Sequence, residues 1–245
     1  DERAQHILGT TDFIDKTKLA CPLNGEPLHI IPRELRQHVL TDLLASVAKN
    51  HTYPVRISKN ACPRCTDIFG RFLKEYKGDW KKVLIEHARV SRILLSRANS
   101  VGIAVTRPKS EKDQDATEWS GETNYVALPK YGSISDPRTF DFKGYFEIAN
   151  RGMLYSEELL KLSQTFLYDY LGASQEGRIQ PKGFVEVDID EVIIGGTNLP
   201  EWDKMRDTKE MEALRDRIIP IPVPYILRLS DEKKIYAKFF VEGDK

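Results

Sequence analysis

Hydrophobic residues are patterned most clearly in the second half of the chain. Short apolar runs at residues 153–155 and 192–194 each end in polar residues, which is typical of buried strands in a parallel sheet. The spacing at 159–171 predicts a helix, residues 184–187 alternate like one arm of a hairpin, and 218–223 predict a strand that its prolines limit to a sheet edge. Strands alternating with helices predict a three-layer α/β arrangement with a largely parallel sheet.

The first half has helical periodicity. Residues 33–49 carry leucines and valines at the spacing of one amphipathic helix, and a second helix is predicted over 65–76. Residues 80–90 fit either helix or strand, and 92–105 are apolar and partly β-like. The charged segment 107–120 is expected to be a solvated connection, with a domain boundary or a substrate-facing loop as the alternative.

Charge and hydropathy exclude some classes of partner. The chain has 245 residues, with 37 basic and 37 acidic side chains, so no net charge attracts it to nucleic acid or to an anionic membrane. No apolar run approaches the roughly 20 residues that span a bilayer. The first residues, DERAQHILGTTDF, lack the layout of a secretory signal. We therefore expect a cytoplasmic location, with neither membrane nor nucleic acid as a partner.

Two acids follow the apolar run at 153–155. Glu157 and Glu158 stand where a nucleotide hydrolase places one carboxylate beside Mg²⁺ and another to polarise the attacking water. The simpler interpretation is that acids after a buried strand open the next helix favourably against its dipole. On this pair alone the simpler interpretation is favoured.

Two further features have the same ambiguity. Asn198 follows the run at 192–194, where a polar side chain reaches the crevice in which open α/β sheets bind ligands, or simply caps a turn before a proline. Arg217 precedes the apolar run at 218–223, with Arg215 nearby. A guanidinium there suits the γ-phosphate of a neighbouring subunit, or forms a surface ion pair with an adjacent acid.

The order of these features resembles that of AAA+ ATPases, in particular the branch of the bacterial enhancer-binding activators: strand with two acids, helix ending in QEG, strand ending in TN, and arginine before a strand. A narrower resemblance, to the AAA core of PrkA-type bacterial serine protein kinases, covers nearly all of the chain from Cys21. It rests on five blocks in order: CPLNGEPLHIIP, YGSISDPRTFDFKGYFEIANRGM, SQEGRIQ, IIGGTNLPEW and EALRDRIIPIPVPYILRLSDEKKIY.

The resemblance implies a three-layer AAA+-type P-loop NTPase core that uses ATP and Mg²⁺. It assigns Glu158 as the catalytic Walker B acid beside Glu157, Asn198 as sensor 1, and Arg217 as the arginine finger, with Arg215 as second candidate. A finger supplied to a neighbour implies a homo-oligomer. The resemblance also implies a kinase-like region beyond the core that acts on a protein substrate.

We expect three segments. Residues 1–20 are unassigned, 21–120 form a cysteine- and histidine-containing, mainly helical insertion, and 121–245 form the catalytic half of the core. No G-x-x-x-x-G-K-[ST] loop occurs in the chain, so the phosphate-binding residues are expected upstream in a longer parent and this chain alone is expected to be inactive. The H-R-D and D-F-G kinase motifs are also absent. Alternatives are a nucleotide-independent assembly module, or an AAA+ remodelling ATPase or protease.

The three cysteines suggest a second kind of site. The pair Cys62-x-x-Cys65 is half of a typical tetrahedral zinc site, and Cys21, also followed by proline, offers a third ligand. His29 is the first choice for the fourth ligand and His51 the second. A redox pair and three unlinked buried thiols are the alternatives. A zinc site here is expected to be structural, because four protein ligands leave no open position.

Overall fold

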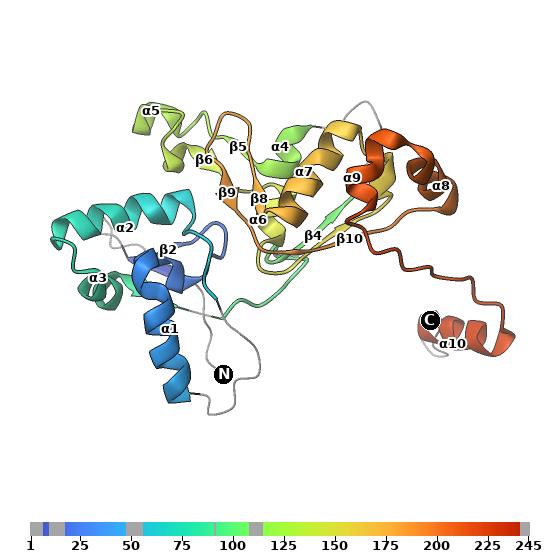
Figure 1. Ribbon diagram of the computed structural model, residues 1–245, viewed down its shortest axis with the longest axis horizontal. Coiled ribbons are helices and arrows are strands. Elements are labelled where there is room, and N and C mark those ends of the chain that lie inside the picture. The colour runs from blue at the N-terminus through green and yellow to red at the C-terminus, as the bar shows by residue number, and fades with distance from the viewer. Residues whose placement is uncertain (1–6, 10–17, 48–55, 91, 108–114, 241–245) are drawn as a thin grey trace.

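The structure is a computed structural model, which describes residues 7–9, 18–47, 56–90, 92–107 and 115–240. Figure 1 shows the helices α1 to α3 gathered in one lobe, and the parallel sheet with the helices α4 and α6 to α9 in another. Residues 1–6, 10–17, 48–55, 91, 108–114 and 241–245 lie outside the described part, and His51 is among them.

A parallel sheet forms the centre of the second lobe. Its strands are β4 (Ile103–Thr106), β7 (Met153–Ser156) and β10 (Val192–Gly195), in the order β10-β7-β4 with both pairs parallel. Ala104 and Leu154 are buried on the same face of adjacent strands. The strands predicted from the runs at 153–155 and 192–194, and the α/β arrangement with a parallel sheet, are confirmed.

The amino ends of β4 and β7 approach each other closely. A Cβ atom on Gly152 would lie 1.9 Å from the carbonyl oxygen of Gly102, so only glycine fits there. The amide of Met153 donates to that same carbonyl at 2.8 Å. The absence of a side chain at Gly152 thus allows the two strands to begin side by side.

Helices α4 (Ala116–Ser120), α6 (Tyr145–Ala149) and α7 (Gln164–Gln175) bury aromatic residues within this lobe. Trp119, Phe146 and Tyr170 form a cluster with ring centroids 5.3 to 5.9 Å apart. The predicted helix over 159–171 is wrong at its start, because a 3₁₀ turn, η3 (Leu159–Lys161), precedes α7. Leu159 and Leu162 are both buried, and a 3₁₀ turn aligns side chains three residues apart.

The first lobe contains the two helices predicted there. They are α1 (Arg33–Val47) and α2 (Pro63–Glu75), and the ambiguous segment 80–90 forms α3 (Trp80–His87) followed by β3 (Ala88–Arg89). The strand β3 pairs with β1 (Ile7–Gly9), which also pairs with β2 (Lys18–Ala20), in an antiparallel sheet of order β2-β1-β3. A 3₁₀ turn, η1 (Pro27–Ile30), precedes α1.

Short elements complete the fold. Their bounds are β5 (Glu122–Thr123), α5 (Leu128–Tyr131), η2 (Pro137–Thr139), β6 (Phe140–Asp141), β8 (Arg178–Ile179), β9 (Val187–Asp188), α8 (Leu199–Asp207), η4 (Lys209–Met211), α9 (Glu212–Arg215) and α10 (Leu229–Phe239). The hairpin expected near 184–187 is β8 paired with β9. Within the predicted loop 107–120, residues 116–120 are helical.

The strand predicted at 218–223 is not present. This segment is extended but forms no strand pair with any described residue, and Ile219, Ile221 and Val223 are 79 to 88% exposed. A strand needs a neighbour for its backbone groups, and prolines at alternate positions remove donors. In Figure 1 the segment runs away from the sheet to α10.

The parallel sheet contains β4 from the segment 21–120 as well as β7 and β10 from the segment 121–245. The boundaries of the predicted insertion stay a prediction. Among the described residues, no helix combines the length and apolar character needed to cross a membrane.

Candidate functional site

The carboxyl ends of the parallel strands bring the predicted acids and Asn198 to one edge of the sheet. Gly195 on β10 is paired with Ser156 on β7, and Ser156 with Thr106 on β4. Backbone bonds continue this alignment past the strand ends, since the amide of Glu157 donates to Thr106 at 2.9 Å and that of Gly196 donates to Ser156 at 2.8 Å. Residues following all three strands therefore share one edge, the usual ligand-binding edge of an open α/β sheet.

Glu157 is held by a residue that the sequence did not single out. Arg107, directly after β4, forms an ion pair with its carboxylate and donates a second hydrogen bond from a terminal nitrogen at 2.9 Å. The Glu157 side chain is 31% exposed. The sequence offered one sign of this contact, because Arg107 directly follows an apolar run, as the acids do. Arg107 is, however, also the first residue of the charged segment 107–120, which was expected to be a solvated connection.

Glu158 has an unusual backbone conformation. Its φ of 51° and ψ of 43° lie in the left-handed region, which costs a non-glycine residue of the order of 1 kcal/mol. The turn leaves its carboxylate exposed, where it pairs with Lys161 at 2.8 Å. An exposed carboxylate at the end of a buried strand is available to a ligand or a water molecule at this edge.

Asn198 caps the helix α8. Its side-chain oxygen accepts a hydrogen bond from the amide of Glu201 at 3.0 Å, as the capping interpretation requires. Within the described residues its side-chain nitrogen makes no hydrogen bond, and the residue is exposed. Capping leaves this N–H donor free to contact an anionic ligand, so the structural and the ligand-binding roles are compatible.

The two candidate finger arginines lie at another place. Arg217 donates to the side-chain oxygen of Gln175 at 2.9 Å, and Arg215 donates to the backbone oxygen of Arg206 at 2.9 Å. Arg217 is exposed, and Arg215 also lies near the acids of its own helical turn. Among the described residues neither arginine contacts Glu157, Glu158 or Asn198, so a finger role requires a second subunit and stays a prediction.

A buried polar network lies below the edge. Thr106 donates to Ser156 at 3.0 Å, and Ser156 is hydrogen-bonded to the hydroxyl of Tyr170 on α7. Thr106 and Ser156 are at most 2% exposed, and burial raises the pKa of Tyr170 well above its ordinary value. The network ties the ends of β4 and β7 to α7. In the sequence, the only indication of this network was that Thr106 and Ser156 are polar residues at the ends of apolar runs.

Two buried carboxyl groups lie elsewhere in the lobe. Glu147 on α6 is 0% exposed, and the carboxylate oxygens of both Glu147 and Glu191 are buried without a hydrogen-bond partner in the described structure. Burial raises the pKa of each to about 8, and the charge of Glu147 adds to the effect on Glu191. Both groups are therefore largely protonated at neutral pH.

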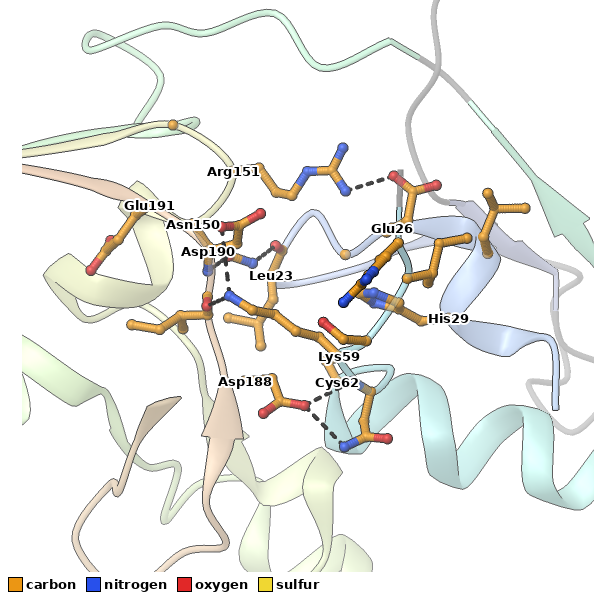
Figure 2. A pocket seen from close by; sticks show the side chains of 18 of the residues that line it. Leu23, Glu26, His29, Lys59, Cys62, Asn150, Arg151, Asp188, Asp190 and Glu191 are labelled. Atoms are coloured by element: carbon orange, nitrogen blue, oxygen red, sulfur yellow. Dashed lines mark hydrogen bonds and ion pairs between the residues drawn. The ribbon is translucent and has the colours of Figure 1, made fainter. Parts of the chain in front are cut away.

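A cavity of about 670 Å³ lies at the opposite end of the sheet from the acids. Gly152 and Val192, at the amino ends of β7 and β10, form part of its wall, and Cys62 and His29 line it from the first lobe. Figure 2 shows Asn150 bonded to Leu23 and Arg151 paired with Glu26 across it. Since the acids lie at the carboxyl ends, this cavity is not the predicted nucleotide site.

The three cysteines converge in the first lobe. The sulfur atoms of Cys21, Cys62 and Cys65 lie within 4.8 Å of one another, and all three side chains are buried. The structure does not bring the predicted fourth ligand, His29, into this group. Burial, helped by Arg36, lowers the pKa of His29 to about 4, so its ring is neutral at neutral pH.

The residues at the acidic edge fit Mg²⁺. Glu157 and Glu158 provide exposed or half-exposed carboxylate oxygens, the donors that this hard cation prefers. The fit requires Arg107 to release Glu157 or to turn toward a phosphate, which a guanidinium also binds.

Known proteins match the chain over most of its length. A sequence profile of the PrkA AAA domain matches residues 11–244. A Bacillus subtilis (strain 168) protein named ATP-dependent protease PrkA is 35% identical over 224 residues, which are 91% of this chain and 33% of the relative. Serine/threonine kinase YeaG of Escherichia coli (strain K12) is 32% identical over 68% of this chain and 25% of the relative. The chain therefore spans a third or less of these relatives.

Solved structures show a weaker likeness. NtrX from Brucella abortus aligns with a TM-score of 0.36 at 21% identity, covering 53% of this chain and 28% of that one. The BchI–BchD complex of magnesium chelatase aligns with a TM-score of 0.38 at 18% identity, covering 57% of this chain and 41% of that one. The profile match alone covers nearly all of the sequence, and the chain belongs to the PrkA AAA domain family.

Proposed function

We propose that this chain supplies the catalytic half of an ATP-hydrolysing site in a longer PrkA-type protein. The observation that carries the proposal is the alignment of Glu157, Glu158 and Asn198 at the carboxyl edge of adjacent parallel strands. Membership of an AAA family supports ATP and Mg²⁺ as the ligands of that edge.

In this proposal each side chain has a distinct role. Glu158, the exposed acid, orients and polarises the attacking water, while Glu157 contacts the hydrated cation. Bound Mg²⁺ would neutralise charge on the phosphates. Asn198, fixed by its capping bond, presents its side-chain N–H to the γ-phosphate, and Arg217 or Arg215 reaches the site of an adjacent subunit in a homo-oligomer.

The half-site needs a phosphate-binding loop, and the sheet has a place for the strand that would carry it. β10 is an edge strand of the described sheet, and Val192 and Ile194 on it are 61% and 46% exposed. The apolar segment 218–223, which pairs with no strand in the described part of the chain, is likewise exposed. An additional strand from the parent protein, lying between β10 and this segment, would cover both and place its loop at the edge with the acids.

The names of the relatives suggest what the whole protein does with ATP. One is named a serine/threonine kinase and another an ATP-dependent protease. We propose the former role, with ATP turnover in this core regulating or driving a kinase-like region outside the chain that acts on a protein substrate.

The test uses the whole parent protein and the variant Glu158→Gln. The amide keeps the size and hydrogen bonding of the side chain but cannot polarise water, so nucleotide binding should persist while the ATP hydrolysis rate falls by about 10²-fold or more. Glu122→Gln, an exposed acid on β5, is the matched control and should leave turnover unchanged. Unchanged turnover in Glu158→Gln would refute the assignment.

A further inference from the structure

All three cysteines of the chain meet at one point, although Cys21 is distant in sequence from Cys62 and Cys65, which lie together at the start of α2. Cys21 lies 3.7 Å from Cys62 and 3.4 Å from Cys65, measured between sulfur atoms and across 41 and 44 residues of sequence. The three side chains are between 1 and 6% exposed. Such convergence brings together the only thiols available to this sequence.

These separations fit a tetrahedral zinc site better than a disulfide. Zinc–sulfur bonds of about 2.3 Å place the sulfurs of a tetrahedral site about 3.8 Å apart, close to the spacing found here. A disulfide requires about 2.05 Å and would use only two of the three sulfurs. The third thiol would then have no role.

Backbone amides orient two of the sulfurs. The amide of Gly25 donates to the Cys21 sulfur at 3.3 Å, and the amide of Cys65 donates to the Cys62 sulfur at 3.3 Å. Hydrogen bonds of this kind stabilise thiolates and hold metal ligands in place. Buried cysteines that act only as small apolar side chains do not require them.

The three cysteines lie where a metal ion would connect an irregular segment to a helix. Residues 21–32, which lead from β2 to α1, contain only the short turn η1 as regular structure, while Cys62 caps α2 and Cys65 lies in its first turn. A metal shared by the cysteines would therefore fasten an irregular segment to a helix terminus.

That segment in turn braces the parallel sheet. Asn150, which precedes β7, donates from its side-chain amide to the carbonyl of Leu23 and accepts a bond from the amide of Asp190 at 2.7 Å. Arg151 pairs with Glu26 at 2.7 Å. The segment following Cys21 thus contacts the amino ends of the strands that lead to the candidate catalytic residues (Figure 2).

We propose that Cys21, Cys62 and Cys65 bind one zinc ion that has a structural role. The ion clamps the segment after Cys21 onto α2 and thereby supports the start of β7. The three thiolates occupy three of the four positions of a tetrahedral site, and the described residues of their cluster, which do not include His29, leave the fourth position to another ligand. The role is assigned as structural because the ion would fasten an irregular segment to a helix terminus. The zinc assignment can be tested separately from the proposed ATPase function, because zinc content and ATP turnover are different measurements.

The test is the zinc content of the protein purified without a polyhistidine tag, measured by plasma mass spectrometry. We expect about one zinc ion per chain, and less than half an ion in Cys21→Ser, Cys62→Ser and Cys65→Ser. Thr66→Ala, an exposed change beside Cys65, should keep the metal, as should His29→Gln. Loss of zinc from His29→Gln would overturn the three-ligand assignment.

A measurement on the unchanged protein covers the case in which serine variants do not fold. Titration with an organomercurial should release zinc in step with the modification of all three thiols, and Co²⁺ in place of zinc should show thiolate charge-transfer absorption. A protein with less than half an equivalent of metal, or with a disulfide between two of these cysteines in its peptide map, would overturn the proposal.

Discussion

The buried carboxyl group of Glu147 gives a quantitative prediction. The perturbation is Glu147→Gln, which replaces an ionisable group by a neutral one of the same shape at a position that is 0% exposed. Desolvation raises the pKa of the native carboxyl from its ordinary value of 4.5 to about 8, an effect that the nearby backbone amides of Gly144 and Glu147 only partly offset.

The direction of the pH dependence follows from comparing proton binding by Glu147 in the native and unfolded states. Because the native pKa is raised, the native state binds a proton that the unfolded chain has released, so stability is fully present below about pH 4.5 and is lost as pH rises through about 8. At 1.36 kcal/mol per pH unit, the interval from 4.5 to 7 corresponds to a loss of about 3 kcal/mol at neutral pH, as an upper limit. Partial titration of the unfolded group near pH 4.5 and of the native group near pH 8 lowers the average slope between pH 5 and 8 to about 1 kcal/mol per pH unit.

The assay is urea denaturation of the unmodified protein and of Glu147→Gln at pH 5, 6, 7 and 8. The free energy of unfolding of the unmodified protein should fall with pH relative to that of the variant, by about 1 kcal/mol per unit. Glu122→Gln, an exposed change, should follow the unmodified protein. Parallel curves for the unmodified protein and Glu147→Gln would refute the argument that this carboxyl is protonated in the native state.

Two further predictions concern the finger and the sheet. Arg217→Ala in the whole protein should lower ATP turnover by about 10²-fold or more without abolishing nucleotide binding, and Arg215→Ala should have the smaller effect. An enzyme that is fully active as a strict monomer would contradict an arginine finger shared between subunits. Gly152→Ala should reduce the free energy of unfolding by about 1–3 kcal/mol, because its Cβ would lie 1.9 Å from the Gly102 oxygen. Gly70→Ala, inside α2 with open space around it, should be neutral or stabilising. If the two changes altered the free energy of unfolding equally, the contact between Gly152 and the Gly102 carbonyl would not be what makes Gly152→Ala destabilising.

Local pattern was sufficient for much of the fold. The runs that became β7 and β10, the helical spacing of α1 and α2, and the polar residues that follow the strands were all readable in the sequence. These features depend on a residue and its neighbours within one or two turns, so periodicity reports them. Cys62 and Cys65 were also recognisable, because their spacing is itself local.

Contacts between distant segments could not be read this way. Cys21 lies with the cysteine pair as expected, but His29, expected as the fourth ligand, does not join them. Whether His29 would join, and whether Arg107 would hold Glu157, depended on how segments far apart in the sequence pack together. The burial of Glu147 is likewise a property of packing, since nothing in its local sequence distinguishes it from an exposed helical acid.

The sequence alone indicated the family, two strands of the parallel sheet, the helices α1 and α2, and the types of residue that follow the strands. The tertiary structure decided which of those residues share one edge: Asn198 follows β10 at the sheet edge where the acids follow β7, whereas Arg217 bonds to Gln175 at the end of α7. It also showed that the apolar run 218–223 has no partner strand among the described residues. The physical reason is that a strand's pattern encodes its faces, whereas its neighbours are chosen by hydrogen bonds and burial among segments far apart in the chain.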